Sequence, residues 1–340
     1  MVVGHGTAAL CTLLSGGSAR TGAPCCCTDS TPEHVRTVDT FYDGAAELRG
    51  VFDEHFASPR QAHPMRFVWD YWHVPEQYTL HRTQAATYFE PELFDALTKA
   101  LTEYGQQHLG CRDISPPWLS YYIDGCEQRL HADVPQGPFA YVLSLTNWDE
   151  RVFSGGETSI LQPFVLDYWR GFDSTSGLEQ SDLLVGVAPR FNRLTIFDAR
   201  LPHGVTRVEG TRDPREARLV LHGWFTEPQP HFEGALDEKV VERGLGKALE
   251  EIYAEITPPL VTGVLSMRIT VGESGKVEEI KTLADTLVCD PSLLEEAAEA
   301  TSAAEARSQV IRTVTKRLEK STFEPSTQGV TMITIPFVFD

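Results

Sequence analysis

Positive charge is scarce in this 340-residue sequence. It has 29 lysine and arginine residues against 48 acidic residues, which gives a formal net charge of −19. A chain with this excess of negative charge is not drawn to the phosphate backbone of DNA or RNA. The composition therefore argues against a nucleic-acid partner.

Long hydrophobic runs are also missing. No stretch comes near the roughly 18 uncharged apolar residues that a membrane-spanning helix needs, so we expect no transmembrane segment. Hydrophobic residues make up 41% of the sequence and charged residues 23%, which is ordinary for a soluble globular protein. The length suits about two domains.

Cysteines are few in the body of the chain, where they occur only at Cys111, Cys126 and Cys289. This is not a disulfide framework, and it indicates the cytoplasm or another reducing intracellular compartment. The other four cysteines lie within residues 1–38, a segment rich in glycine, alanine, serine and threonine. We expect a disordered leader there. Its lack of acids before Asp29 also fits organelle targeting, which we keep as an alternative.

Metal-ligand chemistry is concentrated in two places. His131-Ala132-Asp133 sets an imidazole and a carboxylate two residues apart, and alternate residues of a strand point to the same face. His203 follows much later, in Arg200-Leu-Pro-His-Gly-Val205. Two imidazoles and one carboxylate on one face of an ion leave the opposite positions open, as in the facial triad of non-haem Fe(II) oxygenases.

An arginine begins the last alternating segment of this region, Arg218-Leu-Val-Leu-His-Gly-Trp-Phe225. The alternation predicts a strand with Arg218, Val220, His222 and Trp224 on one face. A buried arginine is rare without a partner, and its planar fork suits a carboxylate. A dicarboxylate cosubstrate would provide that partner.

Over roughly residues 40–227 the ordered set of motifs resembles the Fe(II)/2-oxoglutarate-dependent oxygenases, in particular their prolyl 4-hydroxylase-like branch. The motifs are His131-Ala-Asp133, Phe153-Ser-Gly-Gly-Glu-Thr158, Pro189–Asp198, His203-Gly-Val205 and Arg218–Phe225. The resemblance implies a mostly β fold with some α-helix: a double-stranded β-helix (jelly-roll) oxygenase core with buttressing helices before it.

The same resemblance implies the occupants of the site. Fe(II) would be held by His131, Asp133 and His203, and 2-oxoglutarate by Arg218 with help from Tyr122. O2 would be the second cosubstrate, and ascorbate a further cofactor. Tyr121 is the alternative to Tyr122, one residue away in register. The rival anchors for 2-oxoglutarate are Arg212 and Arg215.

The implied reaction hydroxylates a C–H bond and releases succinate and CO2. The substrate would be a protein side chain, such as a prolyl residue, or a small-molecule metabolite. The third alternative is an inactive metal-binding β-barrel that serves as an interaction module.

Several other elements can be expected from periodicity. An amphipathic helix is expected within residues 39–60, and another from Pro91 to about Tyr104, since proline is well tolerated in a first helical turn. The aromatic segment Phe67–Pro75 predicts a core strand, or alternatively the floor of a substrate cleft. Residues 168–182 predict a long exposed loop of the kind that covers a substrate site.

The composition changes after Phe225. Glu227-Pro-Gln-Pro230 predicts a linker, residues 235–256 a charged helix, and Gly263–Leu283 a hairpin. Arg307–Lys320 predicts a helix and Val330–Phe339 a last strand. This pattern resembles TonB C-terminal domains. We therefore divide the chain into a leader (1–38), an oxygenase domain (39–227), a linker and helix (228–258) and a small α+β domain (259–340), which we expect to bind protein or to oligomerise.

Overall fold

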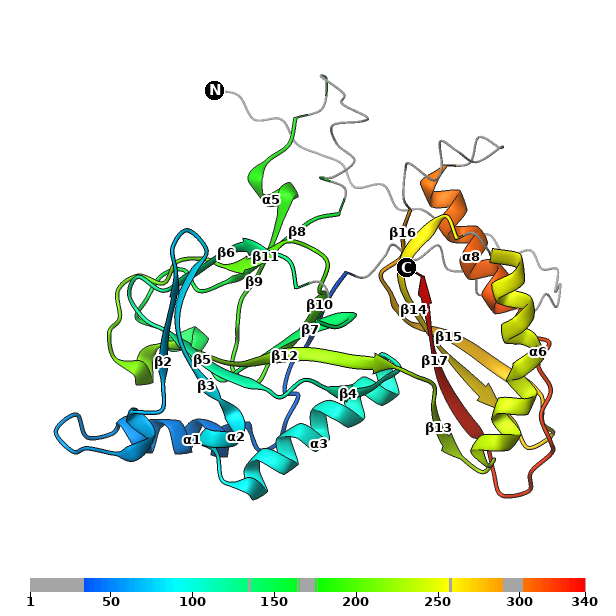
Figure 1. Cartoon of the computed structure of the whole chain (residues 1–340), viewed down its shortest axis with the longest axis horizontal. Coiled ribbons are helices and arrows are strands. Elements are labelled where there is room, and N and C mark those ends of the chain that lie inside the picture. Colours follow the sequence, from blue (N-terminus) through cyan, green and yellow to red (C-terminus); the bar gives the residue numbers. More distant parts are fainter. Residues whose placement is uncertain are drawn as a thin grey trace, which may run out of the picture. The chain divides into compact units, whose positions relative to one another are not determined.

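The computed structural model describes residues 34–133, 136–163, 165, 175, 177–256, 259–289 and 302–339. Figure 1 shows the chain coloured along its sequence. Most of the expected leader lies outside the described residues, and so do its cysteines and much of the loop expected at 168–182.

Eight strands form two antiparallel rows. The first row runs β10 (Leu194–Asp198), β7 (Phe139–Ser144), β12 (Arg218–Pro228) and β5 (Trp118–Tyr122). The second runs β6 (Glu127–His131), β11 (His203–Val205), β8 (Thr158–Leu161) and β9 (Leu184–Val187). Along the chain, β5, β7, β10 and β12 belong to the first row, and the strands between them belong to the second. This alternation is a double-stranded β-helix, or jelly roll, so the expected fold class is confirmed.

Four further strands extend this sheet. β3 (Tyr78–Gln84) pairs with both β5 and β6 and so joins the two rows. β2 (Asp70–Val74) pairs with β3, and β4 (Cys111–Ile114) pairs with β12. β1 (Val35–Val38) pairs with β10. The boundary that we expected for the leader was therefore too late in the chain, because residues 35–38 are part of the sheet.

The alternation in β12 separates a polar face from an apolar one. Leu219, Leu221 and Phe225 are fully buried in the main apolar cluster. The intervening residues, which begin with Arg218, line a cavity on the other face. The period of two in the sequence thus decides which side chains reach the cavity.

Two longer helices support the first row. α1 (Ala45–Phe56) and α3 (Pro91–His108) were both expected, and they bury Leu48, Phe52, Leu97 and Leu101 in the main cluster. α3 begins at a proline and ends before Gly110, whose φ of +68° favours glycine. The short helices are α2 (Ala85–Tyr88), α5 (Gln180–Leu183), η1 (Pro64–Arg66), η2 (Trp148–Glu150) and η3 (Pro214–Glu216).

The aromatic segment Phe67–Pro75 is not a core strand. Phe67 is 77% exposed and Tyr71 is 63% exposed. β2 pairs only with β3 among the described strands, so it is an edge strand. Trp72 nevertheless lines the cavity, as the alternative interpretation of this segment expected.

The C-terminal region forms a second antiparallel sheet, in the order β13 (His231–Gly234), β17 (Thr331–Phe339), β14 (Val261–Val271) and β15 (Val277–Asp285). β16 (Val288–Cys289) also pairs with β14. The helices α6 (Glu238–Ile256) and α8 (Ala303–Leu318) lie side by side and share one apolar cluster with this sheet (Figure 1). The expected hairpin, helices and last strand are confirmed, whereas the resemblance to TonB domains stays a prediction. The expected linker at 227–230 is shorter, because Glu227 and Pro228 still belong to β12 and only residues 229 and 230 separate it from β13.

Candidate metal centre

A cavity of about 220 Å³ is lined by residues of both strand rows. It contains the three predicted metal ligands, His131, Asp133 and His203. It also contains Arg218 and Tyr122. Residues that lie far apart in the sequence therefore meet in one cavity.

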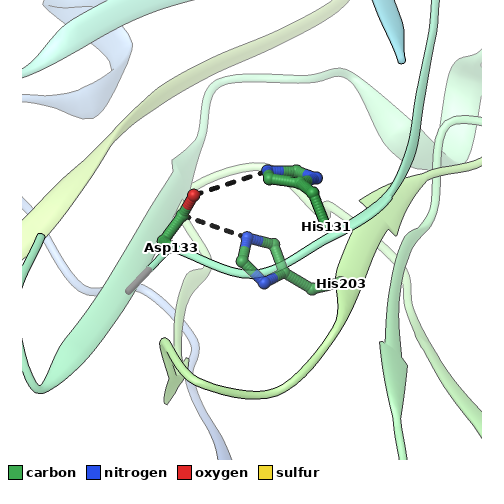
Figure 2. A group of neighbouring side chains, drawn as sticks. All are labelled: His131, Asp133 and His203. Carbon is green, nitrogen blue, oxygen red and sulfur yellow. Dashed lines mark hydrogen bonds and ion pairs between the residues drawn. The ribbon is translucent and has the colours of Figure 1, made fainter. Parts of the chain in front are cut away.

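The three predicted ligands converge on one point (Figure 2). His131 ends β6, His203 begins β11, and the two are directly paired across these strands. One donor atom from each of His131, Asp133 and His203 lies within 4.8 Å of the other two. His203 Nε2 is 3.1 Å from Asp133 Oδ2, and His131 Nε2 is 3.5 Å from Asp133 Oδ1. This spacing suits three ligands of one small cation.

A glycine allows the two histidines to approach. Gly204 follows His203, and a Cβ atom at this position would lie only 2.3 Å from the carbonyl oxygen of Gln128 in β6. A side chain at position 204 would therefore push β11 away from β6. The His-Gly-Val sequence is thus part of the geometry of the site.

Backbone carbonyls fix the tautomer of both histidines. Nδ1 of His131 lies 2.9 Å from Arg129 O, and Nδ1 of His203 lies 2.9 Å from Leu201 O. A carbonyl only accepts hydrogen bonds, so each Nδ1 carries a proton, and a neutral ring of this tautomer turns its Nε2 lone pair toward Asp133. Lone pairs and a carboxylate repel one another unless a cation lies between them. Carbonyl-bound imidazoles of this kind are typical of metal-ligating histidine.

Asp133 is oriented from two sides. Its backbone N–H donates to Ala199 O at 3.0 Å, and the Trp224 indole N–H donates to Asp133 Oδ2 at 3.0 Å. Burial alone would raise the pKa of the Asp133 carboxyl, but the imidazoles of His203 and His131, in their protonated form, and the Trp224 indole N–H bring it below its ordinary value. The side chain is therefore held as a carboxylate, the form that binds metal.

Arg218 is a buried cation without a counter-ion among the described residues. Its side chain is 1% exposed. Nε donates to Gly156 O at 2.8 Å and Nη2 donates to Thr158 Oγ1 at 3.1 Å, but Nη1 is buried and has no partner. An unpaired charge in this position costs several kcal/mol. A carboxylate in the cavity would satisfy both the charge and the free N–H groups.

Tyr122 and Tyr121 face opposite ways. Tyr122 lines the cavity, and its ring centroid is 4.6 Å from the Arg218 guanidinium carbon. Burial raises the pKa of Tyr122, so its hydroxyl stays protonated and can donate. Tyr121 packs instead in the apolar cluster against Trp69, with 4.7 Å between ring centroids. The register therefore favours Tyr122 as the tyrosine beside the anchor.

The rival anchors do not reach the cavity. Arg212 pairs with Asp124 at 3.4 Å and Arg215 pairs with Asp213 at 2.9 Å, both on the surface. Arg200, another arginine near His203 in the sequence, forms a salt bridge of 2.7 Å with the buried carboxylate of Asp198.

His222 lines the cavity and is also hydrogen-bonded. One of its ring nitrogens, Nε2, lies 2.8 Å from Ser120 Oγ.

Several cavity residues were not identified from the sequence as parts of the site, among them Arg82 of β3 and Trp118 of β5. Trp72 of β2 belongs to the segment for which a substrate cleft was the alternative interpretation. Tyr78, Leu80 and Arg82 alternate in β3, and all three line the cavity. The alternation Tyr-x-Leu-x-Arg was the signal that could have revealed the strand.

No family model and no curated protein matches the sequence. Similarity was found among solved structures. A prolyl-4-hydroxylase of Pseudomonas putida is 16% identical, covers 57% of this chain and 92% of its own, and has a TM-score of 0.39. A Trichoplax adhaerens prolyl hydroxylase, solved with a hypoxia inducible factor peptide fragment, is 15% identical. The match covers 57% of this chain and 84% of that one, with a TM-score of 0.38. A viral collagen prolyl hydroxylase of Paramecium Bursaria Chlorella virus-1 is 14% identical. The match covers 56% of this chain and 94% of that one, with a TM-score of 0.36.

None of the helices within the described residues is both long enough and apolar enough to cross a membrane.

Proposed function

We propose that this chain is an Fe(II)- and 2-oxoglutarate-dependent dioxygenase that hydroxylates a C–H bond of its substrate. One observation carries the proposal. A buried guanidinium with an unpaired Nη1 shares a cavity with two imidazoles and a carboxylate whose lone pairs converge. The cavity thus requires both a cation and an anion, and a metal ion with a dicarboxylate supplies both.

The donor set fits Fe(II). His131, Asp133 and His203 would occupy one face of the ion, and the opposite positions would stay open for cosubstrates. When bound, Fe(II) would supply the activation of O2 that couples oxidative decarboxylation of 2-oxoglutarate, to succinate and CO2, with hydroxylation of the substrate. Ascorbate, which the family resemblance implies, would keep the iron reduced.

The protein's own groups would position the cosubstrate. Arg218 would pair with the far carboxylate of 2-oxoglutarate, and Tyr122 would donate its hydroxyl to the same carboxylate. Gly156 O and Thr158 Oγ1 hold the guanidinium in place, so its free edge is fixed before the ligand arrives. Trp224 and the two backbone carbonyls would keep the ligand orientations constant.

The family resemblance favours a protein side chain, such as a prolyl residue, as the substrate, with a small metabolite as the alternative. We also propose that the C-terminal sheet with α6 and α8 binds a protein partner or a second copy of the chain. An inactive metal-binding barrel is the competing proposal for the whole protein, and the following experiment separates it from an enzyme.

Substrate-independent release of succinate from 2-oxoglutarate tests the proposal. The wild-type protein, incubated with Fe(II), ascorbate and O2, should form succinate slowly, and Asp133→Ala should abolish this turnover because one of three ligands is lost. Asp149→Ala is the matched control, since Asp149 is an exposed acid outside the cavity. No succinate from the wild-type protein, or equal rates in wild type and Asp133→Ala, would reject the proposed function.

A further inference from the structure

A second arginine lines the same cavity. Arg82 lies on β3 and is paired with Ser120 of β5, which is paired in turn with Val220 of β12. Arg82, Val220 and Arg218 all line the cavity. Arg82 is therefore two strand spacings, roughly 10 Å, away from the strand that carries Arg218.

Two indole rings hold the Arg82 guanidinium. Its central carbon is 3.6 Å from the ring centroid of Trp72 and 4.3 Å from that of Trp118. Stacking of this kind covers the flat faces of the guanidinium and restricts its rotation. The hydrogen-bonding edge is the part that stays available, and a fixed planar edge favours a planar, bidentate partner.

Arg82 has no counter-ion of its own. Among the described residues it forms no hydrogen bond and no ion pair, and its Nε is buried without a partner. Asp70, which is opposite Arg82 in the β2–β3 pair, is exposed and forms no ion pair with it. Burial lowers the pKa of Arg82, which reflects the same loss of solvation.

The charges of the cavity do not balance without a further anion. Asp133 is the single acid among its described lining residues, and Arg82 and Arg218 are its two arginines. A divalent ion and two guanidiniums carry four positive charges. Asp133 and a 2-oxoglutarate dianion carry three negative charges. One positive charge is left over, and Arg82 is the cation that neither the metal site nor the cosubstrate neutralises.

We propose that Arg82 binds a carboxylate of the substrate, so that the protein acts on molecules that present a carboxylate group near the C–H bond to be hydroxylated. This inference rests on the proposed function and gives the substrate a chemical class. A free amino-acid or peptide C-terminus, an acidic side chain and an organic acid all carry the required group.

The test compares carboxylates with their amides. The wild-type protein, loaded with Ni(II) in place of Fe(II) and saturated with 2-oxoglutarate, is titrated with N-acetyl amino acids and with the matching carboxamides. Trp72 and Trp118 report binding through their fluorescence. Binding of at least one free acid should be tenfold or more tighter than that of its amide.

Variants assign the preference to Arg82. Arg82→Met, which removes the charge but keeps much of the length, should bind acid and amide equally. Arg82→Lys should restore part of the preference, since it keeps the charge without the planar fork. Arg151→Met is the matched control, because Arg151 also stacks on an indole, that of Trp148, but lies outside the cavity. It should behave as wild type.

Three results would overturn the inference: no acid preference in the wild type, a preference that survives in Arg82→Met, or tighter binding of inorganic phosphate than of any carboxylate. A large loss of 2-oxoglutarate affinity in Arg82→Met would also overturn it, because Arg82 would then anchor the cosubstrate. These failures leave the wild-type succinate assay unaffected. If the proposed function itself fails, that assay gives no succinate.

Discussion

Replacing Arg218 by methionine should separate cosubstrate binding from metal binding. The change removes a buried guanidinium that would face the far carboxylate of 2-oxoglutarate, whereas the three metal ligands keep their hydrogen bonds. Loss of one partner of a buried, hydrogen-bonded charge pair costs about 2–5 kcal/mol. At about 1.4 kcal/mol for each factor of ten, the Kd for 2-oxoglutarate should rise by about 30-fold to 4,000-fold.

Calorimetry on Ni(II)-loaded protein can measure this effect with two ligands. One is 2-oxoglutarate, and the other is 2-oxobutyrate, which has the keto acid but no second carboxylate. The wild-type protein should strongly prefer 2-oxoglutarate. Arg218→Met should bind both ligands with similar, weak affinity, because the group that distinguishes them is gone. The affinity for Ni(II) alone should stay within a few fold of wild type.

The comparison of two ligands makes the result decisive. If Arg218→Met still prefers 2-oxoglutarate by the wild-type factor, another residue recognises the second carboxylate and our assignment of the anchor is wrong. If the variant loses Ni(II) affinity as well, the change has disturbed the whole site. Arg151→Met, a stacked arginine outside the cavity, again provides the control for a lost positive charge.

Three further predictions concern the surroundings of the site. Burial lowers the pKa of His222 from 6.5 to about 4. The stability that the neutral ring contributes is therefore complete above about pH 6.5 and is lost as the pH falls toward 4. The loss amounts to at most about 3 kcal/mol. Thermal melts from pH 4 to 7 should be flatter for His222→Gln, and parallel curves would contradict this. Trp224→Phe removes the donor to Asp133 and should weaken Co(II) binding about tenfold, measured by competition with a chelator. Gly204→Ala should destabilise the fold by about 1–3 kcal/mol in urea unfolding, because its Cβ would lie 2.3 Å from Gln128 O. An unchanged unfolding midpoint would show that β6 can shift to accommodate the methyl group at little cost.

Local patterns predicted the fold and indicated which side chains lie together in the cavity. The alternation after Arg218 gave the face of β12 that lines the cavity, and the placement of His131 and His203 beside strand ends brought the two rings together. Such features are carried by spacing along a single strand or by a short motif. They can be recognised in the sequence because each depends on only a few neighbouring residues.

The second arginine could not be found in this way. Trp72, Arg82 and Trp118 belong to three different strands, and their stacking exists only after β2, β3 and β5 have paired. The choice between Tyr121 and Tyr122 likewise depended on a register that one sequence does not fix. The segment Phe67–Pro75 was misjudged because aromatic content indicates a strand equally well at an edge and in a core.

The pairing of β1 with β10 decides how far the N-terminus can be trimmed. β10 is buried along its whole length and is mostly apolar, and β1 covers the side of it that β7 does not. A chain shortened to begin at Asp39 would leave the hydrogen-bonding groups of Leu194–Asp198 open along one side. Uncovered strands of this composition pair with other copies and promote aggregation. A shortened protein intended for crystallisation or assay should therefore retain Val35–Val38.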